Sequence, residues 1–254
     1  MTAYPNIDPL ARVYADAGEA SLAAANELAE LLVNPQTRTL VVAGGNTPLE
    51  LYGLLAQRRL ALGHLNVFTL DEYVGVPLGD SRTCANLLRR TVADAWGIEA
   101  NRFHEISSLE DQAYESILEH ERKLEAFGGI DVVVLGLGKN GHLGFNEPGS
   151  SLESPARVLD LESISVKANS AWFNGEYAPN KGVTLGLSNL LRAKTVFVLA
   201  FGDAKTDAVY NMVSGPSSDR CPASCLQHHS DARFFLDERA AANLPRESYT
   251  TIGL

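Results

Sequence analysis

The chain has 254 residues, of which 45% are hydrophobic, and its 21 Lys and Arg against 31 Asp and Glu give a formal net charge of −10 at pH 7. The composition is that of a globular protein, and the acidic balance argues against a nucleic-acid or membrane partner, because such surfaces need a basic stripe. The sequence shows no apolar run long enough for a membrane span, no signal pattern at its start, and an odd set of three cysteines. We therefore expect a cytoplasmic protein.

Strands and helices alternate through the first half of the chain. The patterns predict a strand at 11–16, a helix at 17–33, a strand at 39–43, a helix at 49–59, a strand at 65–70, and helices at 84–96 and 109–127. The second strand passes into Gly44-Gly45-Asn46-Thr47-Pro48, where Thr47 can cap the following helix and Pro48 suits its first turn.

A buried strand followed by polar groups is predicted in the middle of the chain. Residues 132–135 form a continuous apolar and mostly β-branched run, which is typical of a strand buried on both faces of a parallel sheet. Glycines then bracket Lys139-Asn140, and His142 and Glu147 follow. Glycines permit positive φ and close approach to a ligand, and an imidazole oriented by a carboxylate is suited to proton transfer. The alternative is an ordinary turn with a surface histidine.

The second half continues the alternation. The patterns predict a strand at 156–161, a polar loop that contains Trp172 and Phe173, a strand at 182–187, a buried strand at 195–201, a helix from Lys205 to about 213, a segment of helical character at 221–229, and a last strand at 232–237. Strands separated by helices predict an α/β fold: one domain over 1–254, built on an open, mostly parallel, Rossmann-like sheet with helices on both faces.

Four of the predicted strand ends carry polar or glycine-rich sequence, at 44–48, 71–73, 136–147 and 202–205. Because parallel strands end at one edge of their sheet, we expect these segments to converge there. A glycine turn at a helix N-terminus favours an anion, and a lysine can add charge. The expected phosphate-binding group consists of Gly44, Gly45, Asn46, Thr47, Gly136 and Lys205. The alternatives are a purely structural turn and a solvated lysine.

Asp71 directly follows the strand at 65–70 and is the carboxylate that we expect to face a pocket at this edge. Its neighbour Glu72 must point to the opposite side if the backbone is extended, so only one of the two carboxylates can enter a given pocket. The alternative for Asp71 is a helix cap or turn residue.

The remaining histidines and cysteines carry a weaker pattern. Cys221, Cys225, His228 and His229 lie close in sequence, but the order Cys-x3-Cys-x2-His-His is not a usual structural zinc spacing, and no metal site is expected. His64, His104 and His120 have no polar company and are expected to be surface or helix residues.

With these pieces in place, the chain resembles the glucosamine-6-phosphate deaminases (isomerases), whose superfamily also includes the 6-phosphogluconolactonases. The stretches that carry the resemblance are 70–75, 135–151 and 221–229, and the order and spacing of elements match over nearly the whole chain. The Asn146-Glu147-Pro148 ending is typical of the deaminase branch. The resemblance implies a NagB/RpiA-type fold and a small-molecule sugar-phosphate substrate, with no metal or organic cofactor.

The resemblance also implies residue roles. His142, held by Glu147 and accompanied by Asn140, would move a proton at the ring oxygen to open the sugar ring. Asp71 would then transfer a proton from C2 to C1 of a 2-amino aldose phosphate. Hydrolysis of the resulting imine would release ammonia and a ketose phosphate, so that glucosamine 6-phosphate and water would give fructose 6-phosphate.

The sequence departs from the family pattern at several positions. Asn140 stands where an aspartate is frequent, the turn at 44–48 has one extra residue, and Ala171 follows Ala-Asn-Ser where the family has a phosphate-binding arginine. Arg82 and Lys181 are conceivable substitutes on which no expectation rests. Of the family's allosteric residues Arg157 fits, but Leu159 stands where a lysine is usual, so we expect no strong allosteric activation.

Other functions remain open from the sequence alone. The longer turn at 44–48 is closer to the lactonase branch, so a 6-phosphogluconolactonase-like hydrolase is the alternative, and a non-catalytic sugar-phosphate sensor is a third hypothesis. The sugar configuration is open, as is the assembly state, for which a homo-oligomer is one expectation.

Overall fold

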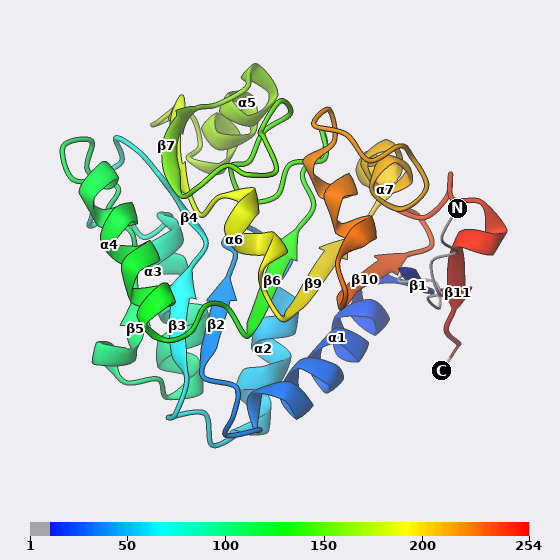
Figure 1. Cartoon of the computed structure of the whole chain (residues 1–254), viewed down its shortest axis with the longest axis horizontal. Helices are drawn as coiled ribbons and strands as arrows, with labels where there is room; N and C mark the ends of the chain where they lie inside the picture. The colour runs from blue at the N-terminus through cyan, green and yellow to red at the C-terminus, as the bar shows by residue number, and fades with distance from the viewer. Residues whose placement is uncertain (1–10, 254) are drawn as a thin grey trace.

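The computed structural model describes residues 11–253, and its centre is an eight-stranded sheet (Figure 1). The strand order is β11 (Tyr249–Thr251), β1 (Ala11–Tyr14), β10 (Ala232–Asp237), β9 (Thr195–Ala200), β6 (Val132–Gly136), β2 (Thr39–Val42), β3 (Asn66–Thr69) and β5 (Phe103–His104). Every neighbouring pair in this sheet is parallel. The predicted α/β fold on a mostly parallel sheet is therefore confirmed.

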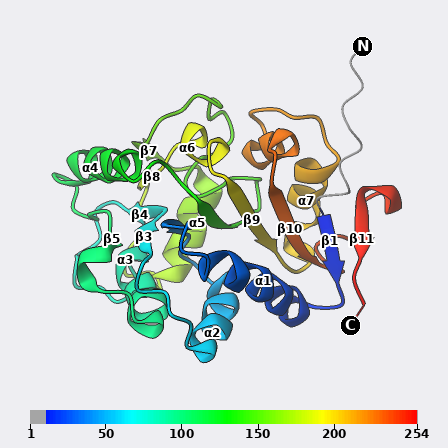
Figure 2. The same cartoon turned by 60° about the horizontal axis from the view of Figure 1, so that its bottom comes forward.

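Helices cover both faces of the sheet (Figures 1 and 2). One hydrophobic cluster joins the sheet to α1 (Ala17–Leu32), α2 (Leu49–Arg58), α3 (Cys84–Leu88) and the π-helical turn η1 (Arg89–Asp94). A second cluster joins the other face to α4 (Ala113–Ala126), α6 (Leu187–Leu191), α7 (Thr206–Val213) and the 3-10 helix η4 (Pro222–His228).

The central strands have apolar side chains on both sides because both faces are covered. Val133 of β6 lies in one hydrophobic cluster, whereas Val132 and Val134 lie in the other, and all three are buried. The register pairs Val132 with Leu40 and Val134 with Val42. This explains why the sequence shows an unbroken apolar run here rather than an alternating one.

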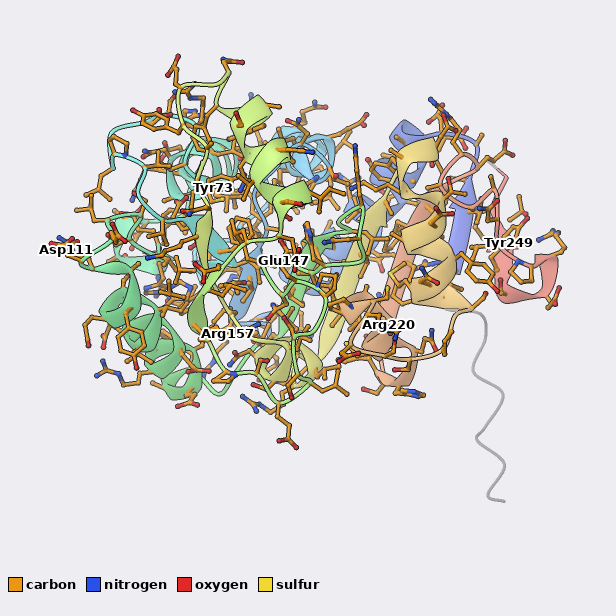
Figure 3. The ribbon with its side chains drawn as sticks, turned by 90° about the horizontal axis from the view of Figure 1, so that it is seen from above. Tyr73, Asp111, Glu147, Arg157, Arg220 and Tyr249 are labelled. Atoms are coloured by element: carbon orange, nitrogen blue, oxygen red, sulfur yellow. The ribbon has the colours of Figure 1, made fainter. Side chains whose placement is uncertain are left out.

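A second, smaller sheet lies beyond the carboxyl ends of the central strands. It is antiparallel and consists of β4 (Asp71–Tyr73), β8 (Lys181–Thr184) and β7 (Arg157–Asp160). Together with α5 (Ser163–Trp172), it lies at the upper left of Figure 1, on the side of β3, β2 and β6. Figure 3 shows this layer from above, with Tyr73 of β4 and Glu147 labelled. The sequence predicted two of these strands but not their separate sheet.

Several predicted boundaries were wrong. The polar loop expected around Trp172 is mostly helix α5, whose Ser- and β-branched-rich sequence gives little helical signal. The strand at 232–237 is not the last, because β11 follows it, and the helix expected at 84–96 changes to a π-helical turn after Leu88. Short 3-10 helices complete the chain at η2 (Ala100–Arg102), η3 (Asp203–Lys205) and η5 (Arg246–Ser248). None of the described helices is long and apolar enough to cross a membrane.

His120 differs from the expectation of a surface residue. It lies on α4, as one expectation had it, but it is 2% exposed, and its Nε2 lies 2.8 Å from the carbonyl oxygen of Thr69 at the end of β3. Its ring packs edge-on against the ring of Phe68, with 5.0 Å between the ring centroids. Burial lowers the pKa of His120 to about 3, despite the opposing effect of the hydrogen bond to Thr69. The imidazole is therefore neutral at pH 7 and helps attach α4 to the sheet.

This burial predicts an acid-sensitive stability. The unfolded chain binds a proton at His120 below its ordinary pKa of 6.5, while the folded chain does not, so the free energy of unfolding should fall as the pH drops below 6.5, by up to about 1.4 kcal/mol per pH unit. In His120→Gln this contribution should disappear. Denaturant unfolding at a series of pH values measures the slope, and exposed His228, changed to Gln, is the matched control. Equal slopes in wild type and His120→Gln would contradict the assignment.

Candidate active site

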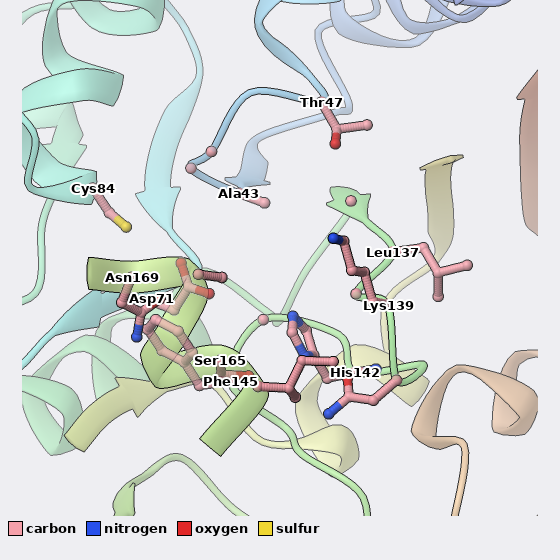
Figure 4. A pocket seen from close by; sticks show the side chains of 18 of the residues that line it. Ala43, Thr47, Asp71, Cys84, Leu137, Lys139, His142, Phe145, Ser165 and Asn169 are labelled. Atoms are coloured by element: carbon pink, nitrogen blue, oxygen red, sulfur yellow. Dashed lines mark hydrogen bonds between the residues drawn. The ribbon is translucent and has the colours of Figure 1, made fainter. Parts of the chain in front are cut away.

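A cavity of about 590 Å³ opens at the carboxyl ends of the central strands (Figure 4). The strands β2, β3, β6 and β9 are neighbours in the sheet, so the segments that follow them meet at this edge. The cavity is lined by Ala43, Gly44, Gly45, Thr47, Asp71, Tyr73, Cys84, Gly136, Leu137, Gly138, Lys139, Asn140, His142, Gly144, Phe145, Ile164, Ser165, Lys167, Ala168, Asn169 and Lys205. Four strand ends that are distant in sequence thus contribute to one cavity.

Asp71 supplies the carboxylate of the cavity. It is the first residue of β4, directly after β3, and only 7% of its surface is exposed. Burial raises the pKa of Asp71 to about 6, although the His142 charge and the Cys84 thiol oppose this shift. A carboxylate with this pKa is ionised at pH 7 and is a stronger base than an ordinary aspartate.

Glu72 points away from the cavity, as the extended backbone predicted. Its carboxylate accepts hydrogen bonds from the backbone N–H groups of Tyr73 (2.8 Å), Cys84 (3.0 Å) and Ala85 (2.8 Å). It therefore binds the N-terminus of α3 to β4 and keeps the backbone of Asp71 in place. The two adjacent carboxylates have separate tasks.

His142 and Glu147 form the second chemical group. The Nδ1 atom of His142 lies 3.4 Å from Oε2 of Glu147, an ion-pair distance, and the Asn140 side-chain amide donates to the same oxygen at 2.8 Å. The Asn140 side-chain oxygen also accepts from the His142 backbone N–H at 3.3 Å. Burial raises the pKa of Glu147, but the neighbouring His142, Ser165 and Asn140 groups outweigh it, so the pKa lies below its ordinary value. Glu147 is 4% exposed and is therefore a buried, ionised partner behind the imidazole.

The loop that carries His142 needs its glycines. A Cβ atom at Gly138 would lie 2.4 Å from the His142 ring, and one at Gly141 would lie 2.4 Å from the Cys221 sulfur. Gly141 also has a φ of +82°, a conformation that L side chains rarely adopt. The loop is thereby packed between the imidazole and the η4 helix, and its shape fixes where His142 points.

The glycine turn after β2 opens toward the same cavity. The backbone N–H groups of Gly44, Gly45, Asn46 and Thr47 make no hydrogen bond to other described residues. The expected Thr47 cap is not formed: the residue before α2 is Pro48, no side chain caps the helix, and Thr47 lines the cavity instead. Unpaired amides at the start of a ten-residue helix favour an anion.

The other predicted phosphate-binding residues divide into two groups. Gly136 and Lys205 line the cavity, and the Lys205 ammonium donates to the Leu137 carbonyl oxygen at 2.5 Å. Asn46 is exposed, and its side chain is not part of the lining. A phosphate contact from Asn46 would therefore come from its backbone N–H.

Sequence reasoning missed the walls of the cavity. Ser165, Lys167 and Asn169 come from α5, which was expected to be loop, and Tyr73 and Phe145 pack together at 5.4 Å between ring centroids. The serine hydroxyl is buried without a hydrogen-bond partner among the described residues. In the sequence, only the Ala-Asn-Ser stretch at 168–170, which resembles the family pattern, indicated that this segment could contribute to the site.

Arg82 and Lys181, the two conceivable substitutes for the family's phosphate-binding arginine, form ion pairs outside the cavity. Arg82 pairs with Asp80 and Glu176, both at 2.6 Å, and Lys181 pairs with Glu110 at 3.1 Å. Neither residue lines the cavity.

The four residues of the cysteine–histidine segment do not form a metal site. Both ring nitrogens of His229 have backbone partners, Nε2 at the Ala193 carbonyl oxygen and Nδ1 at the Asp231 N–H. Among residues 11–253, no three His, Cys, Asp or Glu side chains lie close enough together to hold a metal ion.

Comparison with known proteins places this geometry in a family. Residues 14–235 match the family described as glucosamine-6-phosphate isomerases/6-phosphogluconolactonase. A protein named glucosamine-6-phosphate deaminase from Cutibacterium acnes is 37% identical over 231 residues, which cover 89% of this chain and 88% of that one. A protein of the same name from Hahella chejuensis is 36% identical over 243 residues, which cover 93% of each chain.

Solved structures agree. A monomeric glucosamine-6-phosphate deaminase, described as a missing link of the NagB superfamily, superposes with a TM-score of 0.86 at 28% identity and covers 91% of this chain and 99% of that one. The 6-phosphogluconolactonase from Trypanosoma cruzi has a TM-score of 0.76 at 20% identity, with 92% and 96% covered, and supports the fold alone. The chain therefore belongs to the glucosamine-6-phosphate isomerase/6-phosphogluconolactonase family.

Proposed function

We propose that this protein is a deaminating aldose–ketose isomerase that converts glucosamine 6-phosphate and water to fructose 6-phosphate and ammonia. The observation that carries the proposal is the presence of a basic carboxylate, Asp71, and an imidazole–carboxylate pair, His142 and Glu147, around one cavity. The relatives that are more than 30% identical and bear the name glucosamine-6-phosphate deaminase support it.

Ring opening is assigned to His142. The imidazole takes the proton of the O1 hydroxyl and delivers a proton to the ring oxygen, so that the C1–O5 bond breaks and C1 becomes an aldehyde. Between these two transfers the imidazole carries a positive charge. Glu147 stabilises this charge, because its carboxylate is buried, ionised and 3.4 Å from Nδ1. Asn140 holds the same carboxylate oxygen and so fixes the orientation of the pair.

Isomerisation is assigned to Asp71. The C2 proton lies next to the C1 carbonyl, so Asp71 can remove it. The C1 oxygen then takes a proton from the 2-ammonium group, which gives the enolamine, and the protonated Asp71 returns its proton to C1. The resulting C2 imine takes up water and releases ammonia, which leaves the ketose. The raised pKa of Asp71 suits it to both removal and return of the proton. Asp71, the 2-ammonium group and water account for the proton transfers of this step.

The glycine turn and Lys205 are assigned to the phosphate. The unpaired amides of 44–47 and the start of α2 offer hydrogen bonds to an anion, and Lys205 adds a positive charge. We propose further that the chain acts as one cytoplasmic domain over 1–254. Residues 1–10 of that domain lie outside the described part, and the homo-oligomer remains a prediction.

A panel of sugars tests the reaction. Purified protein should release ammonia from glucosamine 6-phosphate and form fructose 6-phosphate in equal amounts, and unphosphorylated glucosamine should react far more slowly. Ammonia and ketose are measured in parallel assays, and galactosamine 6-phosphate tests the sugar configuration. Absence of ammonia from every 2-amino hexose phosphate, together with hydrolysis of 6-phosphogluconolactone, would replace the proposal by the lactonase alternative.

Asp71→Asn should reduce kcat for ammonia release by a factor of at least about 100, because an amide cannot accept the C2 proton. Binding of the substrate should persist. The adjacent Glu72→Gln is the matched control: it replaces a carboxyl group that accepts three backbone hydrogen bonds outside the cavity, so it should lower Tm by several degrees with a smaller effect on kcat. The reverse pattern, with activity lost in Glu72→Gln and kept in Asp71→Asn, would contradict the assignment.

The pKa of Asp71 also predicts the pH dependence. A general base acts in its deprotonated form, so kcat/KM should reach half of its plateau at about pH 6 and fall with each lower pH unit. Initial rates between pH 4.5 and pH 8 measure the profile. Circular dichroism at the same pH values separates protonation of Asp71 from acid unfolding. A profile that stays flat down to pH 4.5 would exclude Asp71 as a base with the raised pKa.

A further inference from the structure

Lys139 is a cavity residue to which the proposed function gives no role. It lies in the loop after β6, three residues before His142, and is exposed. Within residues 11–253 it has no acidic partner at ion-pair distance, and the same holds for Lys205. Two lysines that line one cavity without a counter-charge form an arrangement that an anion would stabilise.

The fold places these two lysines side by side. The strands β6 and β9 are neighbours, with Gly136 paired with Leu199, and each strand is followed by one of the lysines. The Lys205 ammonium donates to the carbonyl oxygen of Leu137, two residues before Lys139, which attaches it to the loop that carries Lys139.

The electrostatics of Lys205 agree with this placement. Burial lowers the pKa of Lys205, and the second cause is the positive charge of Lys139. Lys167, the third lysine of the cavity, comes from α5 and does not contribute to this shift. Lys139 is therefore the cation whose field acts on Lys205.

The glycine turn lies on the same side of the cavity. A Cβ atom at Gly136 would lie 3.5 Å from Cβ of Thr47, so the end of β6 and the turn are in contact. In Figure 4, the Lys139 side chain points from its loop toward the side of Thr47. Unpaired amides, a hydroxyl and two ammonium groups thus border one part of the cavity, opposite the region of Asp71.

We propose that Lys139 binds the phosphate of the substrate together with Lys205, as a second cation of the phosphate site. The inference rests on the proposed function, since the anion it concerns is the phosphate of the proposed substrate. A phosphate ester carries close to two negative charges at pH 7, and two flexible ammonium groups can neutralise it from two sides. Binding would also remove the repulsion between the two lysines.

The test measures binding without turnover. Glucitol 6-phosphate, which has no carbonyl group and cannot react, is titrated calorimetrically into wild type, Lys139→Gln, Lys139→Arg, Lys167→Gln and Lys205→Gln, and unphosphorylated glucitol is the reference ligand. Lys139→Gln should weaken binding of the phosphate ester at least tenfold and reduce its dependence on salt, while Lys139→Arg should restore most of the affinity. Lys123→Gln, which removes a charge on α4 outside the cavity, is the matched control and should bind as wild type does.

Three outcomes overturn the inference: unchanged affinity in Lys139→Gln, an equal loss for glucitol and its phosphate, or a loss in Lys167→Gln in place of Lys139→Gln. The proposed function fails independently of these. If no amino-sugar phosphate yields ammonia while Lys139→Gln still weakens binding of the ester, the phosphate site stands and the reaction assignment falls. Ammonia release with an unchanged KM in Lys139→Gln would leave the reaction in place and remove Lys139 from the site.

Discussion

Parallel pairing of β6 with β2 on one side and β9 on the other is the constraint on which the site depends. The register brings Val133 beside Val41 and Val196, so the three strands run together and end at the same edge. Backbone hydrogen bonds and apolar packing between the strands therefore bring together the segments that follow them, namely the glycine turn, the His142 loop and the Lys205 segment. The position of the site thus depends on strands whose buried valine side chains do not line the cavity.

The proton-transfer groups and the positively charged groups lie in different parts of the cavity. Asp71 and the His142–Glu147 pair provide proton acceptors and donors, whereas the turn at 44–47 and the two lysines provide positive potential. This separation is consistent with a substrate that has an anion at one end and the reacting carbons at the other. It also keeps the lysines from neutralising Asp71, whose pKa is raised by burial rather than lowered by a cation.

The sequence predicted the parts of this structure that follow from local rules. The apolar run of β6 indicated a strand covered on both faces, and the alternation of an extended chain separated Asp71 from Glu72. The failures have physical causes too. Local capping rules assigned Thr47 to the helix, but its hydroxyl belongs to the cavity. The helix α5 carries little amphipathic signal because half of its residues line the cavity rather than pack in a hydrophobic core. Proximity between Lys139 and Lys205 depends on the strand order, which no local pattern contains.

The position of β1 has a consequence for how the chain is made. This early strand lies between two late ones: Ala11 pairs with Phe234 of β10 and with Tyr249 of β11. One edge of the sheet is therefore closed by partners that leave the ribosome more than two hundred residues apart. Until β10 has been synthesised, β1 has no strand to pair with, and the half of the sheet built on β2, β3 and β6 has to persist without it. Completion of the sheet thus waits for the late strands and joins segments from opposite parts of the sequence.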